Sequence, residues 1–227
     1  MPPRALSPSG LFLIDKPEGL SSFAVVAEVR RRTGARTGHA GTLDPFATGL
    51  LLVLSGAATK LASCFVGLDK RYETAVDLTA LTDSGDREGE VVERVEAPSD
   101  EELERRLEAL RGEVELPIPA ASAVKIGGER AYRLHRRGVA VEMPLRRSRV
   151  DALDVISYSD GIARLSLRVS SGTYVRAIAA ALGGHCATLR RSEVGPFRVE
   201  EADPDRLLSA EEALARAGVG ASGREAP

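Results

Sequence analysis

The stretch GHAGTLDPFATG, residues 38–49, decides how this chain is interpreted. It holds a single carboxylate, Asp44, between a glycine-rich approach and Pro45, a composition that disfavours helix and strand interiors. Gly38 and Gly41 permit backbone conformations that residues with a Cβ avoid. The apolar run LLLVLSG that follows indicates a buried strand. A charged residue on a stiffened loop before a core strand is a candidate catalytic group, although Asp-Pro beside glycine is also an ordinary surface turn.

The composition is ordinary for a soluble globular protein and is compatible with an enzyme domain. The 227 residues, 43% hydrophobic and 28% charged, can bury a sizeable core. No apolar run reaches the length of a membrane span, and the opening MPPRALSPSG lacks a signal-peptide core, which predicts a cytoplasmic protein without membrane contact. Cys64 and Cys186 have no paired spacing and are expected to be structural thiols. His185 beside Cys186 lacks a second ligand pair, so no metal site is expected.

Charge is unevenly distributed along the chain, whose net charge is only −2. Residues 125–150 contain eight Lys or Arg and two acids, a local net of +6. Residues 83–105 contain ten acids and three Arg, a net of −7, and residues 200–227 contain seven acids and three Arg, a net of −4. A basic stripe between acidic flanks can hold a polyanion on one face, although such runs are equally typical of solvated surfaces.

The periodicity of hydrophobic residues, together with capping and turn residues, predicts a mixture of helices and strands. Strands are expected at residues 11–14, 50–54, 72–78, 150–156 and 163–169, and helices at residues 22–32, 57–65, 99–110, 129–137, 173–182 and 209–217. Hairpins mixed with helices predict an α+β fold with a largely antiparallel sheet.

Several details of these elements are also predicted. The first helix is expected to turn four side chains inward and to end near Gly34, the inward set being Phe23, Val26, Ala27 and Val29. Ser99 and Glu102 form a candidate capping box, and Thr173 a candidate helix cap. The Gly- and Asp-rich residues 82–89 are the best candidate for a mobile loop.

The stretch at residues 38–49 resembles the signature of the pseudouridine synthases, specifically the TruB family, which modifies the T loop of tRNA. Further segments in the family's order extend the resemblance over about residues 10–200: GLFLIDKPEGLSSF (10–23), GAATKLAS (56–63), DKRYETAVDL (69–78), SAVKIGGERAYRLHRRG (122–138), SSGTYVRAIAAALG (170–183) and LRRSEVGPF (189–197). The resemblance implies a central mixed sheet with flanking helices and a cleft, and base flipping followed by cleavage and re-formation of the glycosidic bond of uridine-55. That isomerisation gains no atoms and involves no redox change, so no cofactor is expected.

The resemblance also assigns three catalytic residues. Asp44 matches the family's essential aspartate, and a carboxylate can attack covalently or abstract a proton and then leave. Arg176, in GTYVR, matches the arginine that pairs with it and favours its ionised form. Tyr72 matches a tyrosine whose ring replaces the stacking that a flipped uracil loses. Without the family, Arg176 would be interpreted as a surface helix residue and Tyr72 as a core strand residue.

Five further residues are expected to bind substrate. The family places a histidine at the position of His39 within the T loop, and an apolar residue at the position of Leu189 on the pocket floor. Tyr174 is expected to form a second wall of the pocket. Lys16 and Lys60 are expected to contact phosphate or to position loops.

The end of the chain departs from the family pattern. The expected division is a catalytic domain at residues 1–202 and a short helix and tail at residues 203–227, without the RNA-binding module, resembling a PUA domain, that bacterial members usually carry. AALGGHCATLRR, residues 180–191, is shorter than usual, so its loop is expected to be tight.

The expected partner is the T stem-loop of tRNA, bound by a monomer that requires no protein partner. Two other functions stay open: a tRNA-binding folding helper with secondary catalysis, and an unrelated carboxylate hydrolase. The hydrolase usually needs a second placed acid, which no motif supplies beside Asp44.

Overall fold

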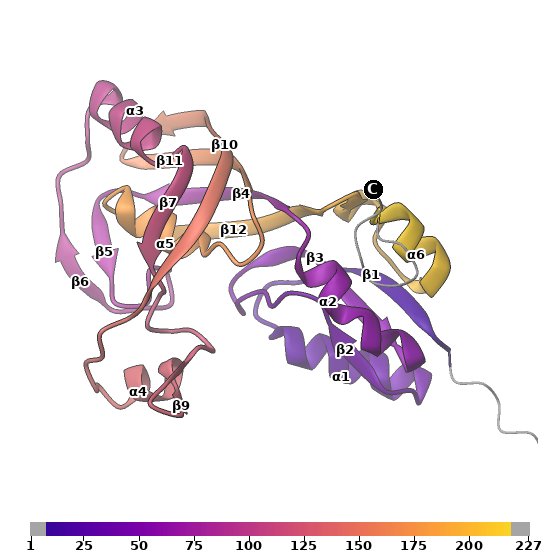
Figure 1. Cartoon of the computed structure of the whole chain (residues 1–227). Helices are drawn as coiled ribbons and strands as arrows, with labels where there is room; N and C mark the ends of the chain where they lie inside the picture. Colours follow the sequence, from indigo (N-terminus) through magenta and orange to yellow (C-terminus); the bar gives the residue numbers. More distant parts are fainter. Residues whose placement is uncertain (1–7, 219–227) are drawn as a thin grey trace, which may run out of the picture. The chain divides into compact units, whose positions relative to one another are not determined.

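The computed structural model describes residues 8–218, which form two compact units (Figure 1). The first unit contains residues 8–72 and 190–218, and the second is Glu73–Leu189. Most of the opening MPPRALSPSG, in which no signal peptide is predicted, lies outside the described residues. So does the end of the predicted C-terminal tail.

The first unit is built on strands β1 (Gly10–Lys16) and β3 (Thr48–Ser55), which pair antiparallel along their whole length. β14 (Asp203–Ser209) extends this sheet on the other edge of β1. The free edge of β3 is shared: β2 (Thr37–His39) pairs antiparallel with its end, and the last residues of β12 (His185–Val194) pair parallel with its start. β13 (Phe197–Arg198) and the short helix η2 (Val199–Glu201) follow.

Alternating side chains on β1 and β3 supply two separate cores. Leu11, Leu13 and the even-numbered leucines of β3 face a core that includes Phe65, Phe197 and Leu214. This core is covered by helices η1 (Gly56–Leu61), α2 (Ala62–Val66) and α6 (Ala210–Arg216). Phe12, Ile14, Leu51 and Val53 face the opposite way, against helix α1 (Ser22–Thr33). Because both faces are covered, β3 is a continuous hydrophobic run, as the sequence predicted.

Helix α1 begins and ends at the predicted signals but turns a different face inward. Ser21 caps it by accepting from the Ala24 N–H, and Gly34 ends it in the left-handed region. Its buried apolar residues are Val25, Val26 and Val29. The predicted inward positions of Phe23 and Ala27 are wrong, because both side chains are exposed.

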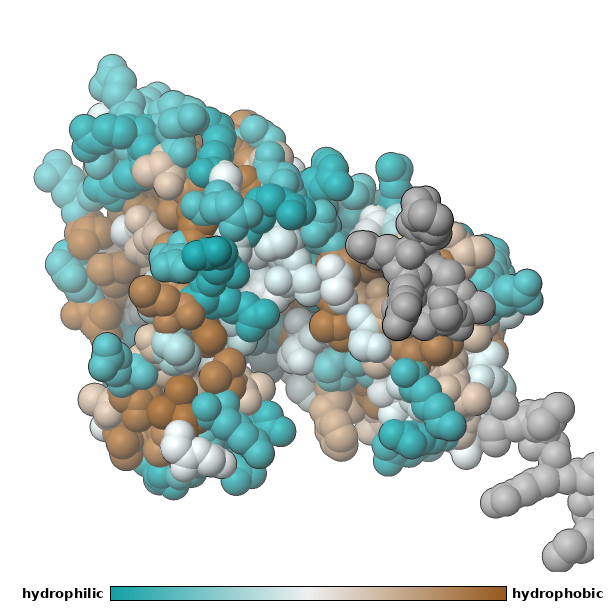
Figure 2. Space-filling model, in the orientation of Figure 1, coloured by the Kyte–Doolittle hydropathy of each residue, from teal (hydrophilic) through white to brown (hydrophobic). Residues whose placement is uncertain are grey.

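The second unit contains a sheet in the order β12–β4–β11–β10–β7. Its strands are β4 (Lys70–Asp77), β11 (Ile162–Val169), β10 (Leu145–Ser159) and β7 (Gly112–Pro117). Helix α3 (Asp100–Ala109) packs against β10, and helix α5 (Val175–Ala181) against β7. Hydrophilic side chains cover α3 in Figure 2, as expected from its acidic composition.

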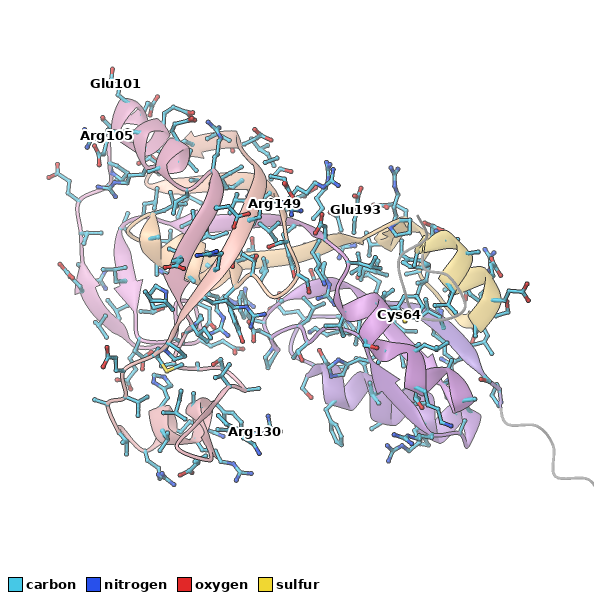
Figure 3. All side chains as sticks on the ribbon, viewed as in Figure 1. Cys64, Glu101, Arg105, Arg130, Arg149 and Glu193 are labelled. Atoms are coloured by element: carbon cyan, nitrogen blue, oxygen red, sulfur yellow. The ribbon has the colours of Figure 1, made fainter. Side chains whose placement is uncertain are left out.

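Two small hairpins complete the second unit. β5 (Ala80–Thr82) pairs with β6 (Val91–Arg94), and β8 (Lys125–Ile126) pairs with β9 (Glu129–Arg130), which leads into helix α4 (Ala131–Arg136). The β8–β9–α4 segment forms a lobe of this unit that carries Arg130, whereas Arg149 lies on β10 (Figure 3). All eight Lys and Arg of residues 125–150 are exposed or half-buried.

The predicted α+β class with a mixed, largely antiparallel sheet is confirmed. β3 with β12 is parallel, whereas the pairs β1–β3, β1–β14, β2–β3, β10–β11 and β10–β7 are antiparallel. Other details differ. The helix predicted at 57–65 is a 3₁₀ helix followed by one α turn. Thr173 does not cap α5, because Tyr174 is the N-cap and the Thr173 hydroxyl donates to Ser170 O at 2.9 Å. Ser99 caps α3, but the Glu102 carboxylate binds Arg106 instead of completing a capping box.

Candidate active site

Asp44 is the half-buried carboxylate of a loop between β2 and β3. Its carbonyl accepts from the Ala47 N–H at 3.1 Å, which closes a turn over Pro45 and Phe46. Leu43 and Phe46, on either side, are buried and tie the loop to the core. Gly41 has φ +97°, as a left-handed turn requires. Gly38 does not use this freedom, because it lies in β2, opposite Leu54, without a positive φ.

Lys16, at the end of β1, anchors the residue after Asp44. Its fully buried ammonium donates to the carbonyl oxygens of Pro45 at 3.1 Å, Leu20 at 2.6 Å and Pro17 at 2.9 Å. The Gly19 N–H also donates to Pro45 O, at 2.8 Å. One buried cation therefore joins the 17–20 turn to the Asp44 loop.

Ser22, the first residue of α1, anchors the residue before Asp44. Its buried hydroxyl donates to Leu43 O at 2.9 Å and accepts from Leu43 N at 2.8 Å. A single side chain thus satisfies both main-chain polar groups of a buried loop residue, each of which would be costly to leave unpaired.

Arg191, on β12, anchors the glycine-rich start of the loop. Only 1% of its surface is exposed. Nη2 donates to Gly41 O at 3.1 Å, Nη1 to Thr42 O at 3.5 Å, and Nε to Leu50 O at 2.8 Å. The strand approaches β3 so closely that a Cβ on Gly49, whose φ is +102°, would overlap the Arg191 main chain.

Burial lowers the pKa of two basic side chains in the first unit, His39 and Lys70. Burial, and secondarily the charge of Arg191, lowers the pKa of His39, so its imidazole is neutral at neutral pH. Within the described residues no group hydrogen-bonds its buried Nδ1. Burial, with Arg191 again second, lowers the pKa of Lys70 to about 8. Tyr72, two residues further on β4, is 7% exposed, and Lys60 is exposed on η1.

Arg176 lies in the second unit, in the first turn of α5, and is 3% exposed. Nη1 donates to Ser84 O at 2.8 Å and lies 3.4 Å from the Asp86 carboxylate, and Nη2 donates to Ala121 O at 3.0 Å. Asp86 in turn accepts from the Ser84 hydroxyl at 2.8 Å and the Glu88 N–H at 3.0 Å. The predicted mobile loop 82–89 is therefore fixed at its centre by a buried ion pair.

A cavity of about 310 Å³ lies beside Arg176 in the same unit. Its lining is mainly apolar and comes from α5, from the end of β7 and from the loop after β5: Thr82, Asp83, Ser84, Gly85, Pro117, Ile118, Pro119, Arg176, Ala177, Ala180 and Ala181. Tyr174, half-buried at the N-terminus of α5, and Leu189, buried on β12, belong to this unit but do not line the cavity.

The predicted site residues thus fall into two groups. Asp44, Lys16, His39, Lys60 and Tyr72 lie in the first unit, where Lys16 directly contacts the Asp44 loop. Arg176, Tyr174 and Leu189 lie in the second unit.

Sequence reasoning missed Ser22, Asp86 and Arg191 as structural supports of these groups. Ser22 and Arg191 lie in LSSF and LRRSEV, within two of the segments that carry the family resemblance. Their place in these segments was the sequence signal that could have indicated a role.

Comparison with known proteins gives a consistent result. The model of the TruB family pseudouridylate synthase N-terminal domain matches residues 30–175, more than half of the chain. A tRNA pseudouridine synthase B from Mycobacterium sp. (strain KMS) is 43% identical over 218 residues, which cover 90% of this chain and 73% of the relative. The enzyme of the same name from Corynebacterium efficiens is 42% identical over 229 residues, covering 92% and 77%.

Solved structures agree on the fold. A chain of a Cbf5-Nop10-Gar1 complex has a TM-score of 0.64 and 25% identity, covering 83% of this chain and 50% of that one. A chain of an archaeal box H/ACA sRNP Nop10-Cbf5 complex has a TM-score of 0.62 at 21% identity, covering 96% and 57%. The present chain therefore spans about half the length of those structures.

Fold and relatives together define a pseudouridine synthase-type catalytic scaffold, and hence an isomerase class. The chain belongs to the TruB family of pseudouridylate synthases. Within residues 8–218, no helix is long and apolar enough to cross a membrane.

Proposed function

We propose that this protein isomerises uridine to pseudouridine in the T loop of tRNA, at uridine-55. The observation that carries the proposal is the support of the Asp44 loop, where three buried side chains bind the main chain on both sides of one half-buried carboxylate. Such support is what a catalytic group needs, since small misplacements of reacting groups cost large factors in rate. The relatives' name, tRNA pseudouridine synthase B, supports the substrate.

In the proposed reaction the C1′–N1 glycosidic bond breaks and a C1′–C5 bond forms. C5 then loses its proton and N1 gains one, so the product is an isomer of the substrate. Asp44 acts as the nucleophile, or as the base that abstracts a sugar proton, and is regenerated at the end. The target uridine must leave the base stack first, because its reacting atoms are inaccessible within it.

Two further residues have proposed catalytic roles. Arg176 is assigned as the cation that favours the ionised nucleophile, a role that rests on the family resemblance. Its burial beside Asp86 supports a fixed rather than a diffuse charge. Tyr72 is assigned as the flat surface for the flipped uracil, which a Tyr72→Phe variant would retain and a Tyr72→Leu variant would lose.

The remaining site residues are proposed to bind or to position. His39, Tyr174 and Leu189 would contact the RNA loop, and Lys60 a phosphate. Lys16 is fully buried, which favours loop positioning over phosphate contact. The basic residues of 125–150 supply the sequence-independent attraction for RNA. Residues 1–202 would form the catalytic domain, and the protein would act as a monomer.

The test uses a T-arm transcript labelled with tritium at uracil C5, because isomerisation releases that tritium to water. Asp44→Asn should abolish release while RNA binding stays within a few fold, since phosphate contacts dominate affinity. Glu200→Gln, at an exposed carboxylate of the same unit, is the control and should react like the wild type. Substantial turnover by Asp44→Asn would remove Asp44 from catalysis. Binding without any release by the wild type would favour the folding helper.

A further inference from the structure

Helix α1 carries an exposed aromatic side chain that its fold does not use. Phe23 is 72% exposed and Leu20, just before the helix, is 46% exposed. The opposite face of α1 is fully engaged by the core through Val25, Val26 and Val29. An exposed phenylalanine contributes little to folding, and aromatic residues are only 4% of this chain.

Phe23 is rigidly connected to the Asp44 loop. Its neighbour Ser22 holds Leu43 by two hydrogen bonds, and Leu43 precedes Asp44. Leu20 O accepts from the Lys16 ammonium, which also donates to Pro45, the residue after Asp44. Both exposed apolar residues are therefore close in sequence to groups that fix the candidate nucleophile.

The charge of α1 favours a polyanionic ligand. The helix contains three Arg and one Glu, a net of +2, and its last turn includes Arg30, Arg31 and Arg32, of which Arg31 pairs with Glu28 and Arg32 with Asp205. Arg36, just beyond it, is exposed as well. A protein-binding surface would be expected to show a broader apolar patch, whereas an exposed aromatic residue on a helix with a basic last turn combines the two features that bind single-stranded nucleic acid.

We propose that Phe23 stacks on an unpaired base of the substrate RNA, a base other than the uridine that reacts. This inference rests on the proposed function, because the RNA must present its loop to the Asp44 segment. The ring offers a flat apolar face, and the short rigid link to Ser22 fixes where that face stands relative to the loop. Phe23 is thus a binding residue that selects loops with a base at one particular position.

The experiment measures dissociation constants for a T stem-loop and for a series in which one loop nucleotide at a time is abasic. Phe23→Ala should weaken binding of the intact stem-loop between about 5-fold and about 100-fold, the range for loss of one base–aromatic stack. Phe23→Trp should bind like the wild type. Val92→Ala, which removes a side chain 64% exposed on β6, is the control and should change nothing.

The abasic series identifies the stacked base. At one loop position other than the target, the wild type should bind the abasic RNA as weakly as Phe23→Ala binds the intact RNA. At that position, Phe23→Ala should bind the abasic RNA and the intact RNA with the same affinity. An equal effect of Phe23→Ala on every RNA, or none, would overturn the proposal. So would a concentration-dependent change of oligomeric state in Phe23→Ala, which would make this face a contact between copies.

Tritium release is followed in parallel so that the two proposals can fail separately. If the wild type releases tritium but no abasic position abolishes the effect of Phe23→Ala, the role of Phe23 is removed and the proposed function stands. If one abasic position abolishes that effect but no tritium is released, the RNA contact stands and the isomerase activity is removed.

Discussion

Arg191 donates through Nη2 to the main-chain oxygen of Gly41 at 3.1 Å, three residues before Asp44 in the chain. The same guanidinium donates to Leu50 in β3, so it joins the start of the loop to the strand that follows the loop. A buried cation with three carbonyl partners is well satisfied, and its removal would leave buried acceptors unpaired.

Arg191→Met should therefore destabilise the protein and disorder the Asp44 loop. We expect a loss of about 1–3 kcal/mol, the cost of one unsatisfied buried acceptor, because of the three contacts the one with Leu50 O is fully buried. Turnover should fall more than RNA affinity, because the loop positions a reacting group. Arg190→Lys, which alters a neighbouring exposed pair with Asp15, is the control for thermal unfolding and tritium release. Equal behaviour of the two variants would show that Arg191 does not support the loop.

The glycines of residues 38–49 should differ sharply in their tolerance of alanine. Gly49→Ala should cost more than about 3 kcal/mol, because φ is +102° and the added Cβ overlaps the Arg191 main chain. Gly38→Ala should change stability by less than about 1 kcal/mol, because Gly38 lies in a strand and nothing is within 4 Å of the added Cβ. Urea unfolding of both variants measures this, and a costly Gly38→Ala would contradict the assigned backbone.

In the second unit, Arg176→Lys should reduce turnover on the order of 100-fold, as expected when reacting groups shift by about 1 Å. Lysine cannot reproduce the planar contacts with Ser84, Ala121 and Asp86. Single-turnover tritium release with saturating protein separates this effect from RNA binding. Arg149→Lys, at an exposed pair with Asp151, is the control. Similar rates for Arg176→Lys and the wild type would mean that residue 176 supplies only diffuse charge.

Lys70 should make stability depend on alkaline pH. Its pKa is lowered to about 8 in the folded state from 10.5, so between pH 8 and 10.5 the unfolded chain binds more protons than the folded one. The contribution of Lys70 to stability therefore rises with pH across that window, by up to about 3 kcal/mol. Lys70→Met should flatten this rise in denaturant unfolding measured from pH 7 to 10.5. An unchanged slope in the variant would assign the pH dependence to another group.

Local sequence signals were enough for the elements that they encode directly. Ser21 and Gly34 delimit α1 because caps act within one turn, and the apolar run after Gly49 predicted β3. The inward face of α1 was mispredicted because Phe23 was assumed to be buried like any large apolar residue, whereas the core accepts Val25 instead. Functional surfaces are where such an assumption is expected to fail.

The supports of the site could not be predicted because they join residues far apart in the chain. Arg191 reaches Gly41 across 150 positions, and Arg176 reaches Ser84 across 92. Neither contact leaves a periodicity or a spacing in the sequence. The Gly- and Asp-rich composition around Asp86 suggested mobility, because composition does not show that a carboxylate will be paired and buried.

The Asp44 loop is held through its main chain. The side chains of Lys16, Ser22 and Arg191 hydrogen-bond to its peptide groups, and none of these hydrogen bonds involves a side chain of the loop. The shape of the loop is therefore largely independent of which side chain stands at position 42. New side chains could be introduced there to alter which RNAs are accepted without moving the carboxylate. Conversely, the hydrogen bonds of these anchors come from outside the loop, so a change that compensates for a lost anchor is expected in the strand or helix that supplied it.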